Sequence, residues 1–99
     1  MSKLSFAEAE QRMKSIEGWR LEGDQITKTF TFSGFPEAVG FVNRLIPGAE
    51  AADHHPDIQI NYKRVTLTYS THSDGGLTAK DFAGAAMADR VAHAAQKNV

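Results

Sequence analysis

Three segments of the chain alternate apolar and polar residues, which is the pattern of a half-buried β-strand. They are residues 26–32, 58–62 and 65–69. A shorter run at residues 19–22 is separated from the first segment by Gly23-Asp24, and this spacing predicts a hairpin. Because each segment has one apolar and one polar face, we expect an antiparallel sheet that is covered on one side only.

The two later segments predict a second hairpin. Only Lys63 and Arg64 separate them, although no Gly or Asn marks the turn. In the first of the two, the alternation of Ile58, Ile60 and Tyr62 predicts that the Tyr62 ring fills the core.

Apolar residues at helical spacing, together with capping signals, predict three helices. They cover residues 6–15 behind a Ser5–Glu8 capping box, residues 36–49, and residues 78–96 behind a Thr78–Asp81 capping box. Within the middle helix the Pro47-Gly48 pair is expected to disturb or end the last turn, because proline removes a hydrogen-bond donor.

The predicted elements follow the order α-β-β-α-β-β-α. This order favours an α+β fold in which a four-stranded antiparallel sheet carries three helices packed on one face. The opposite face, rich in threonine, is left open to water or to a partner subunit. With 99 residues, we expect one domain over residues 1–99.

Composition narrows the class of protein. An apolar content of 41% and a charged content of 23% are typical of a globular domain. The net charge of −1, without a basic run, gives no reason to expect a nucleic acid or an anionic membrane as a partner. Cysteine is absent, which excludes disulfides and thiolate chemistry. No apolar run approaches about 20 residues and the N-terminus does not resemble a signal peptide, so the cytoplasm is the expected location.

Three of the four histidines fall at the ends of the second hairpin. His54 and His55 precede its first strand, and His72 follows its second. Because a hairpin reverses direction, we expect these imidazoles to approach one another. Glu50 and Asp53 precede the pair by about one turn or less and supply nearby carboxylates.

Such a cluster suits proton transfer. Imidazole titrates near neutral pH, and a neighbouring carboxylate selects its tautomer and raises its basicity. Dehydration, proton shuffling and isomerisation are natural reactions for this set. Acyl transfer is less natural, because Ser70 and Thr71 adjoin His72 without a nucleophile-elbow pattern.

Two other interpretations of the histidines stay open at this point. An adjacent His-His pair is often only a feature of a surface turn. The three histidines could also bind zinc with Glu50 or Asp53 as a fourth ligand, although the i, i+4 spacing of helical zinc sites is missing.

The run Glu50-Ala-Ala-Asp-His-His-Pro56, followed at fixed spacing by Tyr62, His72 and Asp81, resembles the signature of the pterin-4a-carbinolamine dehydratase family. The flanking Ser70-Thr71, Gly76-Leu77-Thr78 and Trp19 with its Thr-Phe-Thr-Phe strand are similar to the family as well. The resemblance covers nearly the whole chain, and the family's fold has the element order predicted above.

The resemblance implies a reaction and a set of residues. The family removes water from a 4a-hydroxytetrahydropterin to give a quinonoid dihydropterin, which recycles the tetrahydrobiopterin used in phenylalanine hydroxylation. It implies that His54, His55 and His72 are catalytic by acid/base chemistry, without metal or cofactor, since the pterin is the substrate. By the same resemblance Asp81 supports His72 besides capping its helix. The substrate-binding residues that the resemblance implies are Glu50, Asp53, Pro56, Ser70, Thr71 and Asp81.

The resemblance is incomplete at one position and leaves alternatives open. Animal members of the family carry Trp where this chain has Ile58, so a stacking surface or rim contact is lost.

The family also implies a homodimer or homotetramer, which suits an open sheet face and free edge strands. The alternatives are another pterin, such as one in molybdenum-cofactor metabolism, and a non-catalytic pterin-binding or protein-stabilising module.

Overall fold

The computed structural model describes residues 3–97, and its elements follow the predicted order. A short 3-10 helix is the only element between β4 and α3. The helices and strands are α1 (Phe6–Met13), β1 (Arg20–Glu22), β2 (Gln25–Thr31), α2 (Phe35–Ala52), β3 (Asp57–Asn61), β4 (Arg64–Tyr69), the 3-10 helix η1 (His72–Asp74) and α3 (Ala79–Lys97).

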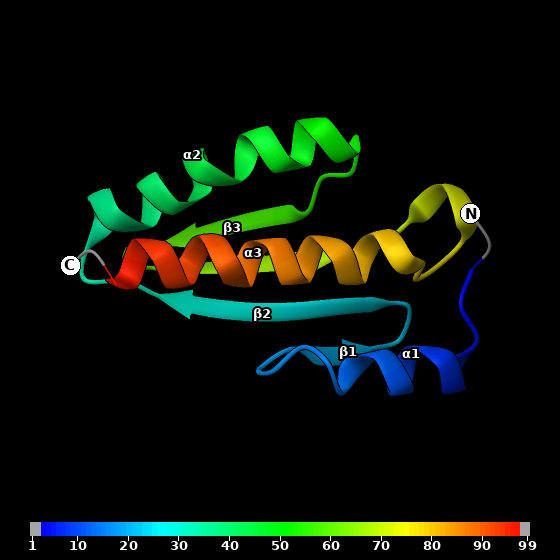
Figure 1. Ribbon diagram of the computed structural model, residues 1–99. Helices are drawn as coiled ribbons and strands as arrows, with labels where there is room; N and C mark the ends of the chain where they lie inside the picture. The colour runs from blue at the N-terminus through cyan, green and yellow to red at the C-terminus, as the bar shows by residue number, and fades with distance from the viewer. Residues whose placement is uncertain (1–2, 98–99) are drawn as a thin grey trace.

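The strands form one antiparallel sheet in the order β1-β2-β4-β3, and the three helices lie on one face of it (Figure 1). This arrangement confirms the predicted α+β fold. The second hairpin therefore lies at one side of the sheet, with β3 as the edge strand and β4 paired on both sides.

The core lies between the sheet and the helices α2 and α3. From the sheet, Val65, Leu67 and Tyr69 of β4 are fully buried, and Phe41 of α2 packs against Phe30 of β2. The face of α3 toward the sheet consists largely of alanines, which let the helix approach closely. Burying these apolar surfaces supplies the main stabilisation of the fold, about 25 cal/mol for each Å² removed from water.

The capping box at the start of α1 is present as predicted. The Ser5 Oγ accepts the Glu8 backbone N–H at 3.1 Å, and the Glu8 carboxylate accepts the Ser5 N–H at 2.8 Å. These hydrogen bonds hold the pKa of Glu8 below its ordinary value. The helix ends at Met13, two residues before the predicted end, and the chain then turns toward β1.

Pro47-Gly48 was expected to disturb or end α2, and the prediction of an end there is wrong. The helix runs through Pro47 to Ala52 and ends at Asp53, which adopts the left-handed conformation with φ 50°. Pro47 lies on the exposed side of α2, so water can reach the carbonyl that loses its intrahelical partner. This extra turn carries Glu50, one of the residues expected at the site.

The prediction that Tyr62 fills the core is also wrong. Asn61 pairs with Arg64, so the turn of the hairpin is Tyr62-Lys63 rather than Lys63-Arg64. Tyr62 occupies the turn at φ 55°, a region that favours Gly and Asn, and its side chain is 65% exposed. The alternation ends one residue earlier than the sequence pattern indicates.

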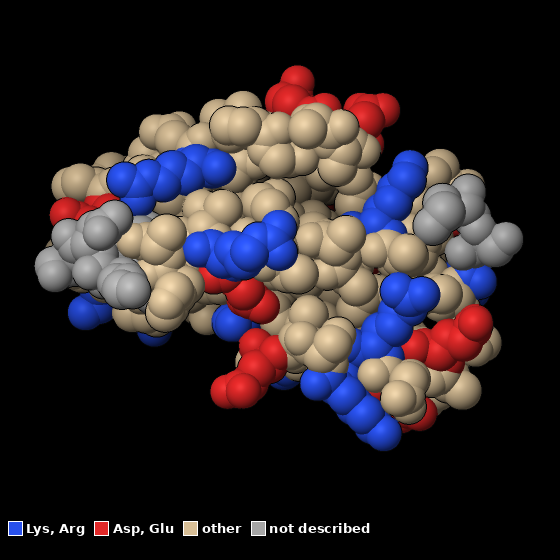
Figure 2. Space-filling model, in the orientation of Figure 1, with Lys and Arg blue, Asp and Glu red and all other residues tan. Residues whose placement is uncertain are grey.

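Charged side chains of both signs are interspersed over the face shown in Figure 2, with acidic atoms gathered at the C-terminal end of α2. Glu50 and Asp53 are the exposed acidic residues of this end. Among the helices that the structure describes, none combines the length and the apolar character needed to cross a bilayer.

Candidate active site

The candidate site lies where the second hairpin opens. In the register of β3 and β4, Asp57 pairs with Thr68, so the residues before β3 and those after β4 meet at one end of the sheet. The last turn of α2 and the first turn of α3 reach the same end. All the residues expected to be catalytic or to bind substrate therefore come from four neighbouring segments, as the hairpin geometry predicts.

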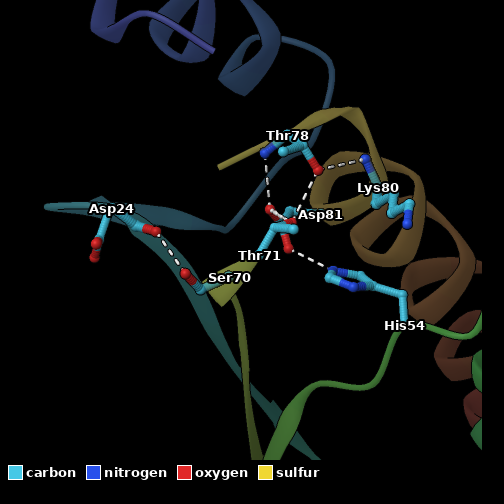
Figure 3. Close-up of polar contacts among 7 residues, drawn as sticks. All are labelled: Asp24, His54, Ser70, Thr71, Thr78, Lys80 and Asp81. Atoms are coloured by element: carbon cyan, nitrogen blue, oxygen red, sulfur yellow. Dashed lines mark hydrogen bonds and ion pairs between the residues drawn. The ribbon is translucent and has the colours of Figure 1, made fainter. Parts of the chain in front are cut away.

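A buried carboxylate lies at the centre of the site. Asp81, in the first turn of α3, has no exposed surface. Its Oδ2 accepts the Thr71 hydroxyl at 2.8 Å and the Thr78 backbone N–H at 2.9 Å, and its Oδ1 lies 2.6 Å from His54 Nε2 (Figure 3). The Thr78 contact is the expected half of a capping box. The other two contacts join Asp81 to β4 and to the loop before β3.

The partner of Asp81 is His54, and this differs from the expectation that Asp81 supports His72. Because a carboxylate only accepts hydrogen bonds, His54 Nε2 must carry a proton toward it. The remaining nitrogen, Nδ1, is then free to act as the proton acceptor when the ring is neutral. The His54 side chain is only 11% exposed, and its ring stacks on Tyr69 with centroids 5.9 Å apart.

His55 forms a second histidine–carboxylate pair, which lies beside α2 and β3. Its Nε2 lies 2.6 Å from Glu50 Oε2, and both side chains are largely exposed. The pair borders an apolar groove of about 100 Å³ between α2 and β3, which Pro56 and Ile58 also line. Glu50 reaches His55 because α2 continues past Pro47.

His72 and Asp53 lie apart from these pairs. His72 begins the 3-10 helix η1 and is exposed. Within residues 3–97 its imidazole makes no hydrogen bond, and neither does the carboxylate of Asp53, whose backbone N–H caps α2. The hairpin thus brings His72 to the correct end of the sheet but not into contact with the other two histidines.

Ser70 and Thr71, which adjoin His72, have different surroundings. The Ser70 hydroxyl donates to the Asp24 backbone carbonyl at 2.9 Å and ties the end of β4 to the first hairpin (Figure 3). Thr71 is buried and its hydroxyl contacts Asp81 and Thr78. Within the described residues, no group of three or more His, Asp and Glu side chains could hold a metal ion.

A second cavity, of about 130 Å³, borders His54. It lies between α2 and α3 and is lined by Gly48, His54, Lys80 and Met87 among others. The two adjacent histidines therefore border two different hollows. Each is smaller than the roughly 300–1,000 Å³ of an ordinary small-molecule pocket, so neither of these two hollows by itself encloses a ligand of that size.

Sequence reasoning missed Tyr69 and the hydroxyl of Thr78 as parts of the site. Tyr69 alternates with Val65 and Leu67, which signals burial but not its contact with His54. Its ring also fits against Gly84 of α3, where a Cβ would lie 2.5 Å from the ring. The Tyr69 hydroxyl is buried and has no hydrogen-bond partner in the part of the chain described.

Burial raises the pKa of Tyr69 to about 12, and the Asp81 charge adds to this effect. An unfolded chain ionises its tyrosines near pH 10, so the stability that Tyr69 contributes is complete below about pH 10 and is lost as the pH rises toward about 12. In a Tyr69→Phe variant this loss disappears. By about pH 11.5, the free energy of unfolding of the wild type should have fallen relative to the variant by about 2 kcal/mol.

Urea unfolding measured between about pH 9 and about pH 11.5 tests this expectation. Tyr62→Phe is the matched control, because it removes the same hydroxyl from an exposed ring. It should leave the pH dependence of the wild type unchanged. Equal pH dependence of the free energy of unfolding in wild type and Tyr69→Phe would contradict a raised pKa for Tyr69.

Comparisons with known proteins identify the family. The family model described as pterin 4 alpha carbinolamine dehydratase matches residues 2–91. A protein of Roseiflexus castenholzii, named as a candidate pterin-4-alpha-carbinolamine dehydratase, is 49% identical over 89% of this chain and 95% of its own length. A protein of Sulfolobus acidocaldarius with the same name is 49% identical over 81% of this chain and 88% of its own.

Two solved structures share the fold. A transcriptional coactivator/pterin dehydratase from Brucella melitensis has a TM-score of 0.87 and 33% identity, covering 92% of this chain and 99% of its own. A pterin dehydratase-like protein described as a RuBisCO assembly factor in the alpha-carboxysome has a TM-score of 0.66 and 25% identity, covering 77% of this chain and 90% of its own. The match of the family model to nearly the whole length, with relatives at almost half identity, shows that the chain belongs to the pterin-4a-carbinolamine dehydratase family.

Proposed function

We propose that this protein is a hydro-lyase that converts a 4a-hydroxytetrahydropterin into a quinonoid dihydropterin and water. The observation that carries the proposal is the pair of histidine–carboxylate contacts, His54 with Asp81 and His55 with Glu50, at the positions of the family signature. Each carboxylate orients its imidazole for proton transfer. The physiological role would be the recycling of tetrahydrobiopterin after phenylalanine hydroxylation.

The reaction needs two proton transfers. The bond between carbon 4a and its hydroxyl breaks, the hydroxyl takes up a proton and leaves as water, and one proton is removed from the nitrogen system of the pterin. We assign the removal to Nδ1 of His54, since Nε2 is engaged with Asp81. The contact with the buried Asp81 carboxylate also fixes the orientation of this imidazole.

The proton for the departing hydroxyl would come from His55 or His72. Both imidazoles are exposed at the same end of the sheet, where a bound ligand would be accessible to them. The remaining members of the proposed site are polar or rim residues that would contact the pterin. They are Glu50, Asp53, Pro56, Ser70 and, through its backbone, Thr71.

In this proposal the chemistry requires neither a metal ion nor a prosthetic group. Imidazoles supply both proton transfers, and the pterin itself provides the electron pair that expels the hydroxyl. Activity should therefore survive exhaustive treatment with a chelator. Loss of activity on chelation that added zinc restores would favour the metal alternative.

Stopped-flow absorbance of 4a-hydroxytetrahydropterin decay tests the function directly. Chelator-treated wild type should accelerate the decay, and His72→Ala should lose at least about 10²-fold of that acceleration if His72 is the acid. His55→Ala measured in parallel identifies the acid when only one of the two variants is impaired. No acceleration by folded wild type would refute the dehydratase proposal and favour another pterin or a non-catalytic binding role.

We also propose that the protein forms a homo-oligomer through the edge strand β3. All five residues of β3 are exposed, although Ile58 and Ile60 point toward the helix side of the sheet. Ile46 of α2 is exposed beside them and lines the same apolar groove. An unpaired edge next to exposed isoleucines favours pairing with a second copy. Such a copy would enlarge and close the hollow beside His55.

The oligomeric state can be measured by sedimentation velocity. The Ile60→Glu variant should shift the wild-type oligomer toward monomer, because a carboxylate on the helix side of the edge would be buried at the interface. Gln59→Glu is the matched control, since it adds the same charge to the same strand on the other face. A wild type that is monomeric at micromolar concentration would contradict the proposal.

A further inference from the structure

We propose that Thr71 and Thr78 are positioning residues that hold His54 in the tautomer with the proton on Nε2. The inference deepens the proposed function, because this tautomer leaves Nδ1 as the proton acceptor. Neither threonine would touch the pterin with its hydroxyl. Both would act through Asp81, which lies between them and the imidazole (Figure 3).

The direction of each hydrogen bond follows from counting protons. A hydroxyl has one proton to donate, and the Thr71 proton points to the carboxylate oxygen Oδ2 of Asp81 at 2.8 Å. In the contact of 2.8 Å between the two threonine hydroxyls, the donor must therefore be Thr78. The Thr78 Oγ1 in turn accepts the backbone N–H of Lys80 at 3.3 Å.

The result is a one-directional chain of donors from the start of α3 to Asp81. Each of the two hydroxyls donates one hydrogen bond and accepts one. The Asp81 carboxylate also accepts a hydrogen bond from the Thr78 backbone N–H at 2.9 Å. All three residues are buried, so water does not compete for these bonds. A chain of aligned donors in a buried setting strengthens its members and keeps one arrangement.

The consequence for His54 is a fixed choice of tautomer. With Oδ2 occupied by two donors, the other carboxylate oxygen faces Nε2 at 2.6 Å and can only accept. If the chain is broken, the Asp81 carboxylate can rotate away from Nε2, and the proton of a neutral His54 can then reside on either nitrogen. Thr71 is the link whose hydroxyl touches Asp81 directly.

Two-bond ¹H–¹⁵N correlation spectra of histidine-labelled protein at about pH 8 read the tautomer of each neutral imidazole. The signals of His54 are assigned by their loss in His54→Ala. In wild type we expect His54 to have a protonated Nε2 and an unprotonated Nδ1. In Thr71→Val, which keeps the shape of the side chain, we expect a mixture of the two tautomers. Thr71→Ser, which restores the hydroxyl, should return the wild-type spectrum.

Thr27→Val is the matched control. Thr27 is as buried as Thr71, at 5% exposure, and its hydroxyl also contacts a second threonine, Thr68, but it has no link to Asp81. This variant should leave the His54 spectrum unchanged. A wild-type spectrum in Thr71→Val, or a wild-type His54 with its proton on Nδ1, would overturn the inference.

Activity provides the second measurement. Thr71→Val should lower kcat about 10-fold with KM within about twofold, because the base is less often in the required tautomer while binding is intact. A larger rise in KM with unchanged kcat would show that Thr71 binds the substrate instead. Because the NMR spectra need no turnover, failure of the dehydratase proposal leaves the tautomer test standing.

Discussion

Replacing His54 by Ala should slow the dehydration of the 4a-hydroxytetrahydropterin by about 10²-fold or more. The variant removes the imidazole that we assign as the base. Among the described residues this is also the only imidazole in contact with the buried Asp81 carboxylate. His93→Ala is the matched control, since His93 is an exposed histidine of α3 outside the proposed site. The His93→Ala variant should catalyse the dehydration at the wild-type rate.

The His54→Ala variant also leaves the Oδ1 atom of Asp81 without its histidine partner, so a loss of rate could arise from a damaged fold. Adding free imidazole separates the two causes. If His54 transfers a proton, imidazole should restore part of the rate in proportion to its concentration, because it can enter the hollow left by the side chain. A folded variant that keeps the wild-type rate would remove His54 from the catalytic set.

Replacing Asp81 by Ala should lower the free energy of unfolding by about 3 kcal/mol. The change removes a capping interaction worth about 1 kcal/mol from α3. It also leaves the Thr71 hydroxyl, the Thr78 N–H and His54 Nε2 without their acceptor, and buried groups that lose a partner are costly.

Urea unfolding followed by circular dichroism measures this loss. Asp57→Ala is the control, because Asp57 is an exposed carboxylate on the edge strand β3. Its effect should stay within about 0.5 kcal/mol. If the two variants cost the same, Asp81 is not the buried link between β4, α3 and the loop before β3. The Asp81→Asn variant, which keeps the shape, should fall between the two.

Much of the fold could be predicted because its signals are local. Alternation at period two identified the strands, and the Ser5–Glu8 and Thr78–Asp81 spacings identified the starts of α1 and α3. Two local expectations were wrong for reasons that lie outside the local pattern. Pro47 is tolerated within α2 because its side of the helix faces water. Tyr62 is exposed because the pairing of Asn61 with Arg64 makes it a turn residue.

For the candidate site, the sequence was sufficient to name the chemical groups and to bring them to one end of the sheet. Histidines before the first strand and after the second strand of a hairpin must lie at the same end of the sheet, although His72 does not contact the other two. The family resemblance, which the comparisons confirm, rested on the same residues. Which carboxylate belongs to which histidine could not be read from spacing, since the choice depends on how α3 sits against β4.

The sequence by itself determined the order of elements, the antiparallel sheet with one covered face and the set of residues available for proton transfer. These follow from periodicity, capping and spacing, which act between neighbours in the chain, whereas the family followed from the resemblance of the Glu50–Pro56 run to a known signature. Only the tertiary structure decided that Asp81 holds His54, that His72 stands apart and that Tyr69 stacks on His54. Those contacts join residues 15 or more positions apart. Gly84 lets α3 pack closely against Tyr69, and this packing places the Asp81 carboxylate of α3 next to His54 in the loop before β3.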